Sequence, residues 1–200
     1  MARTRAADFE EKQQSILRNA AAVFAEFGIR KASMEQVAER SKVSKALLYH
    51  YYHSKNALIF DVIRSHLVEL CDALEAVQRA TLDDDPETRL RKMVHKILEC
   101  YRDADDKHKV MLNRGSSLSE QQTREMHVLE RRIANAVSSV ILEIVPSIND
   151  RRPLLKPITM SLFGMLNWVY MWFRPDGPIS REEYADLATT LILSGIKDVH

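Results

Sequence analysis

The sequence contains few residues that interrupt helices. Only five glycines and six prolines occur among its 200 residues. Sandwiches and barrels need a turn every few residues, and those turns rely largely on glycine and proline. The scarcity of both excludes a fold of many short strands and favours long helices.

Long apolar runs, a secretion signal and grouped cysteines are also missing. The longest stretch without a charge or a proline, Ile158–Phe173, has 16 residues, whereas a membrane span needs about 20. The first residues include arginines and no apolar leader. Cys71 and Cys100 stand alone, with no second Cys or His at ligand spacing. We therefore expect a cytoplasmic protein with reduced thiols, no membrane contact, no metal and no other cofactor.

Motifs of common enzyme classes are absent from the sequence. It has no Gly-rich phosphate loop, no His-x-x-x-His pair and no nucleophile elbow. Ser194 and Lys197 match the pattern S-x-x-K, but without its partner motifs chance explains the match. His50 and His53 lie three apart, and two histidines alone rarely form a metal site. We expect no enzymatic activity.

Hydrophobic periodicity predicts an all-α protein of about nine helices. Capping boxes mark three helix starts, at Ser33, Ser119 and Ser180. The helices divide into an N-terminal three-helix domain, residues 1–54, and a C-terminal helical domain, residues 55–200. The first 55 residues carry ten Lys or Arg against six Asp or Glu, a modest basic excess typical of a phosphate-binding end.

Residues 33–52 form a candidate helix-turn-helix: two short helices, capped by Ser33 and Ser44, flank a break at 41–43. Four apolar side chains are spaced to pack together and fix the angle between the helices: Val37, Ala38, Val43 and Leu48. Four others then face outward: Lys45, Ala46, Tyr49 and His50.

The outward residues suit DNA. Ala46 is small enough to let its helix enter the major groove deeply, and Lys45 can donate to guanine O6/N7 or to a phosphate. The hydroxyls of Tyr49 and Tyr51 suit phosphate oxygens, which set register without reading sequence. Lys55 adds a cation where the next helix begins, a place that already favours anions.

These motifs resemble the TetR family of tetracycline-repressor-like regulators. The resemblance covers roughly residues 10–65 and is carried by Val-Ser-Lys-Ala at 43–46, Leu-Tyr-His-Tyr-Tyr at 48–52 and Ser-Lys at 54–55. It implies a ligand-responsive dimeric repressor that leaves a palindromic operator when a small molecule binds. It also implies that the residue matching Ser33 contacts a phosphate while capping its helix. Six further positions are placed against DNA: Lys45, Ala46, Tyr49, His50, Tyr51 and Lys55.

The chain departs from the family pattern at two positions in the motif. The turn usually has Gly where this chain has Lys42, and a left-handed conformation there costs about 1 kcal/mol. Glu35 stands where some relatives have a base-reading Arg, and its charge suits cytosine N4 or solvent.

The last two helices, expected at about 155–173 and 180–197, are candidates for the homodimer interface. They have more apolar surface than one buried face requires, and Gly164, Ala188 and Gly195 permit close approach. The alternative is that this surface is core of a single chain.

The middle helices are expected to enclose an effector. Large, adaptable side chains are candidates for its lining, although such residues are more often plain core: Met93, Tyr101, Met111, Met126, Phe163, Trp168 and Trp172. Residues 162–177 resemble a subgroup of TetR regulators of lipid, steroid or aromatic-acid catabolism, many of which respond to acyl-CoA thioesters. That resemblance implies a largely apolar ligand with an anionic end, held by Arg114 or Arg124.

Two other functions remain compatible with the sequence. A helical ligand-binding or scaffold protein without DNA activity would share the helical pattern. An activator would share the DNA-contact chemistry of a repressor.

Overall fold

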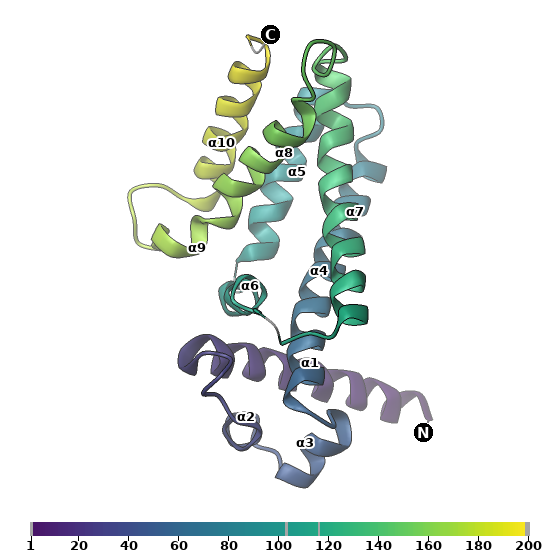
Figure 1. Cartoon of the computed structure of the whole chain (residues 1–200), viewed down its shortest axis with the longest axis vertical. Helices are drawn as coiled ribbons and strands as arrows, with labels where there is room; N and C mark the ends of the chain where they lie inside the picture. Colours follow the sequence, from purple (N-terminus) through teal and green to yellow (C-terminus); the bar gives the residue numbers. More distant parts are fainter. Residues whose placement is uncertain (1, 103, 116, 199–200) are drawn as a thin grey trace. The chain divides into compact units, whose positions relative to one another are not determined.

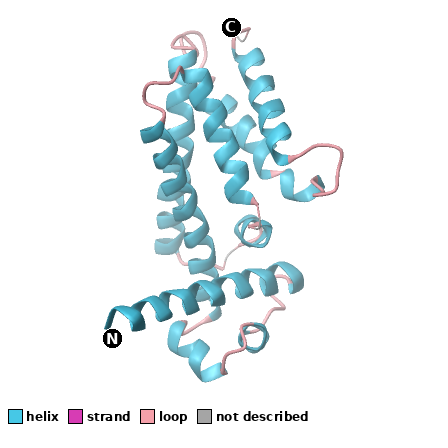
Figure 2. Cartoon of the chain, turned by 180° about the vertical axis from the view of Figure 1, so that it is seen from behind, coloured by secondary structure: helices cyan, strands magenta, loops and turns pink. Residues whose placement is uncertain are grey.

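The computed structural model describes residues 2–102, 104–115 and 117–198 (Figure 1). Its helices are α1 (Ala2–Phe27), α2 (Met34–Arg40), α3 (Lys45–Tyr51), α4 (Lys55–Ala80), α5 (Pro86–Tyr101), α6 (Asp105–Leu112), α7 (Glu120–Ile144), α8 (Leu155–Asn167), α9 (Val169–Trp172) and α10 (Arg181–Ile196). These described residues form helices and loops without a strand, which confirms the all-α prediction (Figure 2). Only Trp168 separates α8 from α9; taken as one broken helix, they bring the described helices to the expected nine.

The three predicted capping boxes are present and explain where their helices begin. Ser33, Ser119 and Ser180 each accept a main-chain N–H through the side-chain hydroxyl, and the side chain three residues on accepts from the serine N–H. Asp85 caps α5, whose first residue is Pro86. Each cap satisfies helix N–H groups that no carbonyl of the helix reaches.

Helix boundaries differ from the sequence prediction at two places. α1 begins at Ala2 rather than near residue 9, and it ends as expected at Gly28, whose φ of 77° is left-handed. The single helix expected at 155–173 is broken at Trp168. The break leaves Trp168 exposed and buries Val169. Within α9, Val169 thus faces the protein interior, whereas Met171 and Trp172 are exposed.

The chain divides into two compact units. Unit 1 consists of the described residues of 1–67 and 103–127, and unit 2 of those of 68–102 and 128–200. Two of the three divisions fall inside α4 and α7, and the third falls between α5 and α6. Unit 1 therefore contains the predicted DNA-binding domain, residues 1–54, together with the beginning of α4, α6 and the beginning of α7.

Unit 1 has a core built on the apolar face of α1, which packs against α2 and α6. Its largest fully buried side chains include Ile16, Phe24, Leu48, Leu58, Ile59 and Ile63. Two histidines are also buried there: the rings of His66 and His108 lie edge to face, with centroids 5.8 Å apart. Burial, and then the nearby His108 and Lys107, lower the pKa of His66 to about 3, so this imidazole is neutral near pH 7.

Unit 2 packs α10 against α5 and α8. Polar contacts join α10 to α5: Arg91 forms an ion pair with Asp186 at 2.9 Å, His95 Nε2 forms a 2.9 Å hydrogen bond with the same carboxylate, and Lys197 pairs with Glu87 at 2.9 Å. The lysine of the S-x-x-K match is thus part of a surface ion pair. No helix in the described chain combines the length and apolarity needed to cross a membrane. Within the same residues, no group of three or more His, Cys, Asp or Glu side chains is placed to hold a metal ion.

Candidate nucleic-acid interface and effector region

The two helices of the motif are locked together by the predicted apolar contact. Val37 and Leu48 are completely buried and Ala38 nearly so, whereas Val43 is half-buried. A main-chain hydrogen bond of 3.0 Å from Val43 N–H to the Ala38 carbonyl closes the turn. This packing fixes the direction in which α3 presents its other face.

The turn itself adopts the strained conformation that the sequence predicts. Lys42 has a φ of 52°, the one positive φ of a non-glycine residue in the described chain. Such a conformation costs an L-residue about 1 kcal/mol or more. The Lys42 side chain is exposed. A lysine at this position therefore strains the backbone but places a cation on the surface of the motif.

The outward face of α3 is small, polar and basic. Lys45, Ala46, Tyr49 and His50 are all exposed, as the sequence predicts, while Leu48 on the opposite side is completely buried. Successive residues of a helix are separated by about 100°, so Ala46 lies about 160° from Leu48 and between Tyr49 and His50. The smallest side chain therefore occupies the middle of the exposed face.

The two tyrosines at the end of α3 have different surroundings. Tyr51 is half-buried, and its ring stacks on that of exposed Phe9 in α1, with centroids 4.6 Å apart. Tyr52 is buried, and its hydroxyl accepts a 3.2 Å hydrogen bond from Gln13 Nε2. Burial is the main cause that raises the pKa of Tyr52 to about 12. Sequence reasoning missed Phe9, because the stacking arises from tertiary packing and leaves no local signal.

Ser33 performs the capping role predicted for it. Its hydroxyl accepts from Gln36 N–H at 3.2 Å, and its own N–H donates to Gln36 Oε1 at 2.8 Å. The side chain is half-buried at the beginning of α2. A phosphate contact by Ser33 would add to these bonds, since a hydroxyl that accepts one hydrogen bond still has its proton to donate.

Lys55 is placed differently from the sequence prediction. Its Nζ donates to the carbonyl oxygens of Ile29, Arg30 and Ala32, at 2.9, 3.3 and 3.0 Å. An ammonium group has three N–H donors, so all of them are directed at the loop between α1 and α2. Lys55 thus ties this loop to the beginning of α4, and its ammonium is engaged by backbone carbonyls.

Lys55→Met should therefore weaken the fold of unit 1 and not simply remove a DNA contact. The substitution leaves partly buried carbonyls without a donor, which costs about 1–3 kcal/mol. We expect a lower urea midpoint and weaker DNA binding whose salt dependence is unchanged.

The matched control for Lys55 is Lys31→Met in the same loop, where the lysine is exposed. It should leave stability within about 0.5 kcal/mol of the unsubstituted protein. A Lys55→Met protein of normal stability, with a salt slope reduced by about 1.8 because each subunit of the dimer loses one contact, would mean that Lys55 contacts a phosphate instead.

An ion pair joins α2 to α3 on the exposed surface. Lys45 Nζ contacts Glu35 Oε1, and each side chain is 57% exposed. The hydrogen bond to Lys45 is the largest cause that lowers the pKa of Glu35, and the same bond raises the pKa of Lys45. Both groups are therefore charged over the whole physiological pH range. The sequence indicates each charge separately but not their pairing.

The residues predicted to line an effector site lie in both units. In unit 2, Met93, Tyr101 and Phe163 are buried. Tyr101 donates a 2.8 Å hydrogen bond to Asn167 Oδ1, and burial raises the pKa of its phenol. Met93 and Phe163 therefore form part of an ordinary apolar core. The Tyr101–Asn167 pair, which joins α5 to α8, adds a hydrogen-bonding group to this interior.

The two tryptophans of the predicted effector set are exposed instead of buried. Trp168 is 57% and Trp172 43% exposed. The end of α8 at Asn167 and the short α9 turn both rings outward. This corrects the expectation that they line an interior site within one chain.

The remaining predicted residues belong to unit 1. Met126 is completely buried, while Met111 and Arg114 are half-buried. Arg124 is exposed and lies 3.5 Å from Glu120 one turn earlier in α7. Arg114 is therefore the less exposed of the two arginines.

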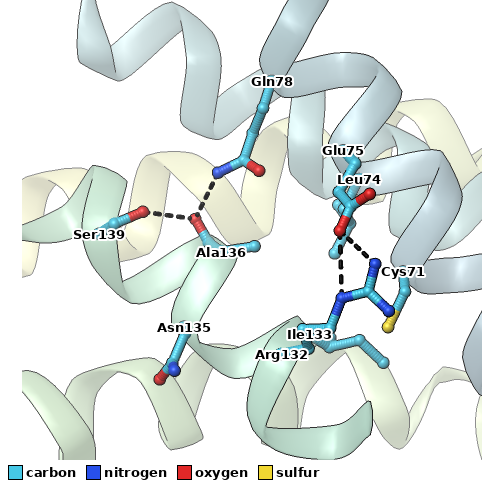
Figure 3. A pocket seen from close by; sticks show the side chains of 9 residues that line it. All are labelled: Cys71, Leu74, Glu75, Gln78, Arg132, Ile133, Asn135, Ala136 and Ser139. Atoms are coloured by element: carbon cyan, nitrogen blue, oxygen red, sulfur yellow. Dashed lines mark hydrogen bonds and ion pairs between the residues drawn. The ribbon is translucent and has the colours of Figure 1, made fainter.

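A cavity of about 290 Å³ lies in unit 2 between α4 and α7 (Figure 3). Its wall consists of Cys71, Leu74, Glu75, Gln78, Arg132, Ile133, Asn135, Ala136 and Ser139. Four of its polar side chains are engaged: Glu75 pairs with Arg132, and Gln78 and Ser139 both donate to the Ala136 carbonyl. None of the predicted effector residues lines this cavity.

Comparison with known proteins agrees with the motif and with the fold. The description "Bacterial regulatory proteins, tetR family" matches residues 16–62, and "Tetracyclin repressor-like, C-terminal domain" matches residues 83–196. The chain belongs to the TetR family. It is a TetR-type transcription regulator, with an N-terminal helix-turn-helix and a C-terminal helical domain.

Relatives from the same family extend over nearly the whole chain. The HTH-type transcriptional repressor KstR2 of Rhodococcus jostii is 25% identical over 94% of this chain and 93% of its own length. A TetR-family regulator from Bordetella parapertussis is 32% identical, with a TM-score of 0.83 over 90% of this chain and 93% of that one. AibR, solved with isovaleryl coenzyme A and operator DNA, has a TM-score of 0.76 at 22% identity over 90% of this chain and 97% of that one, a likeness of fold alone.

Proposed function

We propose that this TetR regulator is a dimeric repressor that binds a palindromic operator and leaves it when a small, largely apolar effector binds. One observation supports DNA reading above all: α3 exposes Lys45, Ala46, Tyr49 and His50 while Leu48 anchors its opposite side. A face of this kind fits the major groove, where base edges are read. As an operator-binding protein it would act in the cytoplasm.

The proposed DNA contacts follow from the exposed face and the caps. Ser33, Tyr49 and Tyr51 would bind phosphates through their hydroxyls, and Lys45 and His50 would reach base edges or phosphates. Ala46 would allow close approach. In this proposal residues 1–54 form the domain that reads DNA, and residues 55–200 form the domain that binds the effector and the second subunit.

The proposed dimer forms through the last helices. Six large apolar side chains there are exposed in a single chain: Met160, Trp168, Met171, Trp172, Leu187 and Leu191. Gly164 and Gly195 border open space, so a second backbone can approach closely, whereas Ala188 is already buried. Soluble monomers rarely expose so much apolar surface in one region. A two-fold dimer would cover it and set two recognition helices about 34–36 Å apart.

The proposed effector is an acyl-CoA thioester. AibR, which shares this fold, was solved with isovaleryl coenzyme A. An acyl chain suits the buried Met93 and Phe163 of unit 2, and the Tyr101–Asn167 pair of the same unit offers a polar group for a carbonyl.

Operator DNA and effector should weaken each other's binding by the same factor. Linkage requires this reciprocity, and typical coupling corresponds to about 5- to 150-fold. The operator is first recovered by selecting bound fragments from genomic DNA. Acyl-CoA thioesters of increasing chain length are then titrated against the protein with and without that operator, by calorimetry, and the operator against the protein with and without thioester.

Two outcomes would contradict the proposal. An effector affinity unchanged by operator DNA would exclude repression relieved by that ligand. Failure to retain any duplex fragment would favour the alternative, a helical ligand-binding or scaffold protein. Free coenzyme A is the control, because it has the phosphates and lacks the acyl chain.

A further inference from the structure

The ion pair between Glu35 and Lys45 lies on the exposed surface of the motif, which would face DNA in the proposed function on which this inference rests. Lys45 is the first residue of α3, and Glu35 lies in the first turn of α2. Both side chains are more than half exposed. An incoming duplex therefore meets a paired anion and cation, not a single positive charge.

The positions of the two charges are fixed by the core of the motif. Val37 and Leu48 bury the contact between α2 and α3, and the Val43–Ala38 hydrogen bond closes the turn. Lys45 Nζ also lies 6.0 Å from the centre of the Tyr49 ring. The ammonium thus lies close to both a carboxylate and an aromatic ring.

A cation and an anion that lie side by side match the major-groove edge of one kind of base pair. A G·C pair presents two acceptors, guanine N7 and O6, on one side and a donor, cytosine N4, on the other. In an A·T pair the adenine N6 donor lies between two acceptors, and a methyl group follows. An ammonium over guanine beside a carboxylate over cytosine satisfies both charges. On A·T the one donor, adenine N6, has an acceptor on each side, so a carboxylate directed at it also adjoins adenine N7 and thymine O4.

We propose that Glu35 is a specificity-determining residue, which together with Lys45 reads a G·C base pair in each half-site. On other sequences the same carboxylate opposes binding. Lys45 must leave Glu35 to reach a phosphate, and Glu35 then faces the DNA backbone without a partner. Penalties of this kind against wrong partners produce discrimination that attraction alone does not.

Glu35→Gln tests the proposal, because glutamine retains the shape and removes the charge. The full-length protein and the variant are each used to select duplexes from a randomised pool. The unsubstituted protein should enrich G·C at one position of each half-site, with discrimination of roughly 5- to 150-fold. In Glu35→Gln that preference should be lost while other positions are retained.

Binding to one fixed duplex of unselected sequence gives a second readout. With Lys45 released for a phosphate, Glu35→Gln should bind this duplex more tightly at low salt. Its affinity should also fall by an additional factor of about twelve between 50 and 200 mM salt, as expected for one more phosphate contact in each subunit of the dimer.

Glu39→Gln is the matched control, since Glu39 is an exposed carboxylate one turn further along the same helix. It makes the same change in net charge and should keep the G·C preference. The proposal is overturned if Glu35→Gln enriches the same bases as the unsubstituted protein, or if Glu39→Gln loses the same preference. Failure of the unsubstituted protein to enrich any sequence would overturn the DNA-binding function as well.

Discussion

Replacing Ala46 with tryptophan should abolish operator binding while the protein stays folded. Ala46 lies in the middle of the exposed face of α3, opposite buried Leu48. A helix with its side chains is about 10–12 Å across, which nearly fills a major groove about 12 Å wide. An indole at this position would hold the helix away and separate Lys45 and Tyr49 from their contacts.

The expected loss is large because a dimer contains the substitution twice. If each half-site loses about 2–3 kcal/mol, comparable to one or two base contacts, the dimer loses about 4–6 kcal/mol. That corresponds to a Kd raised about 10³- to 10⁴-fold, measurable by fluorescence anisotropy on the selected operator.

Ala46→Ser is the control for side-chain size and should bind the operator within a few-fold of the unsubstituted protein. Both variants should unfold within about 0.5 kcal/mol of it, because the position is exposed. An Ala46→Trp protein that binds within tenfold would show that α3 does not enter the groove by this face.

The sequence was most informative where the determinants are local. The boxes at Ser33, Ser119 and Ser180 need only residues three apart, and all three were predicted. The left-handed Lys42 was also predictable, because the turn geometry is set by the motif and only the residue type differs from the usual glycine. The burial of Val37, Ala38 and Leu48 follows from helical periodicity in the same way.

Interactions between distant segments were not predictable. Lys55 donates to carbonyls 23 to 26 residues earlier in the chain, and nothing in its neighbourhood distinguishes that role from a phosphate contact. The Glu35–Lys45 pair depends on the angle between two helices, which periodicity does not give. Phe9 stacks on Tyr51 across more than forty positions in sequence.

Apolar residues posed a different difficulty, because a sequence shows that they will be covered but not by what. Met93 and Trp168 are both large and apolar, yet Met93 is buried and Trp168 is 57% exposed. For Trp168 the exposure results from the end of α8 at Asn167. Trp168 and Trp172 are consequently better candidates for a subunit interface than for an interior ligand site.

Replacing Leu187 and Leu191 with glutamate should convert the proposed dimer into a monomer. The two leucines are one turn apart on α10 and about half exposed, so they share one face of the helix. In a two-fold interface each patch meets its own copy or a neighbouring part of it. Four new carboxylates would then be buried together, and an unpaired buried charge is strongly destabilising.

The monomer should be visible by light scattering during size exclusion at micromolar concentration, with helical circular dichroism unchanged. Operator affinity should fall by at least about 10³-fold, since a monomer binds one half-site and loses the second set of contacts. Leu82→Glu combined with Val128→Glu is the control: both residues are highly exposed, at 73% and 60%, and lie outside α8–α10. If the control dissociates and the α10 variant remains a dimer, the subunits meet through another surface.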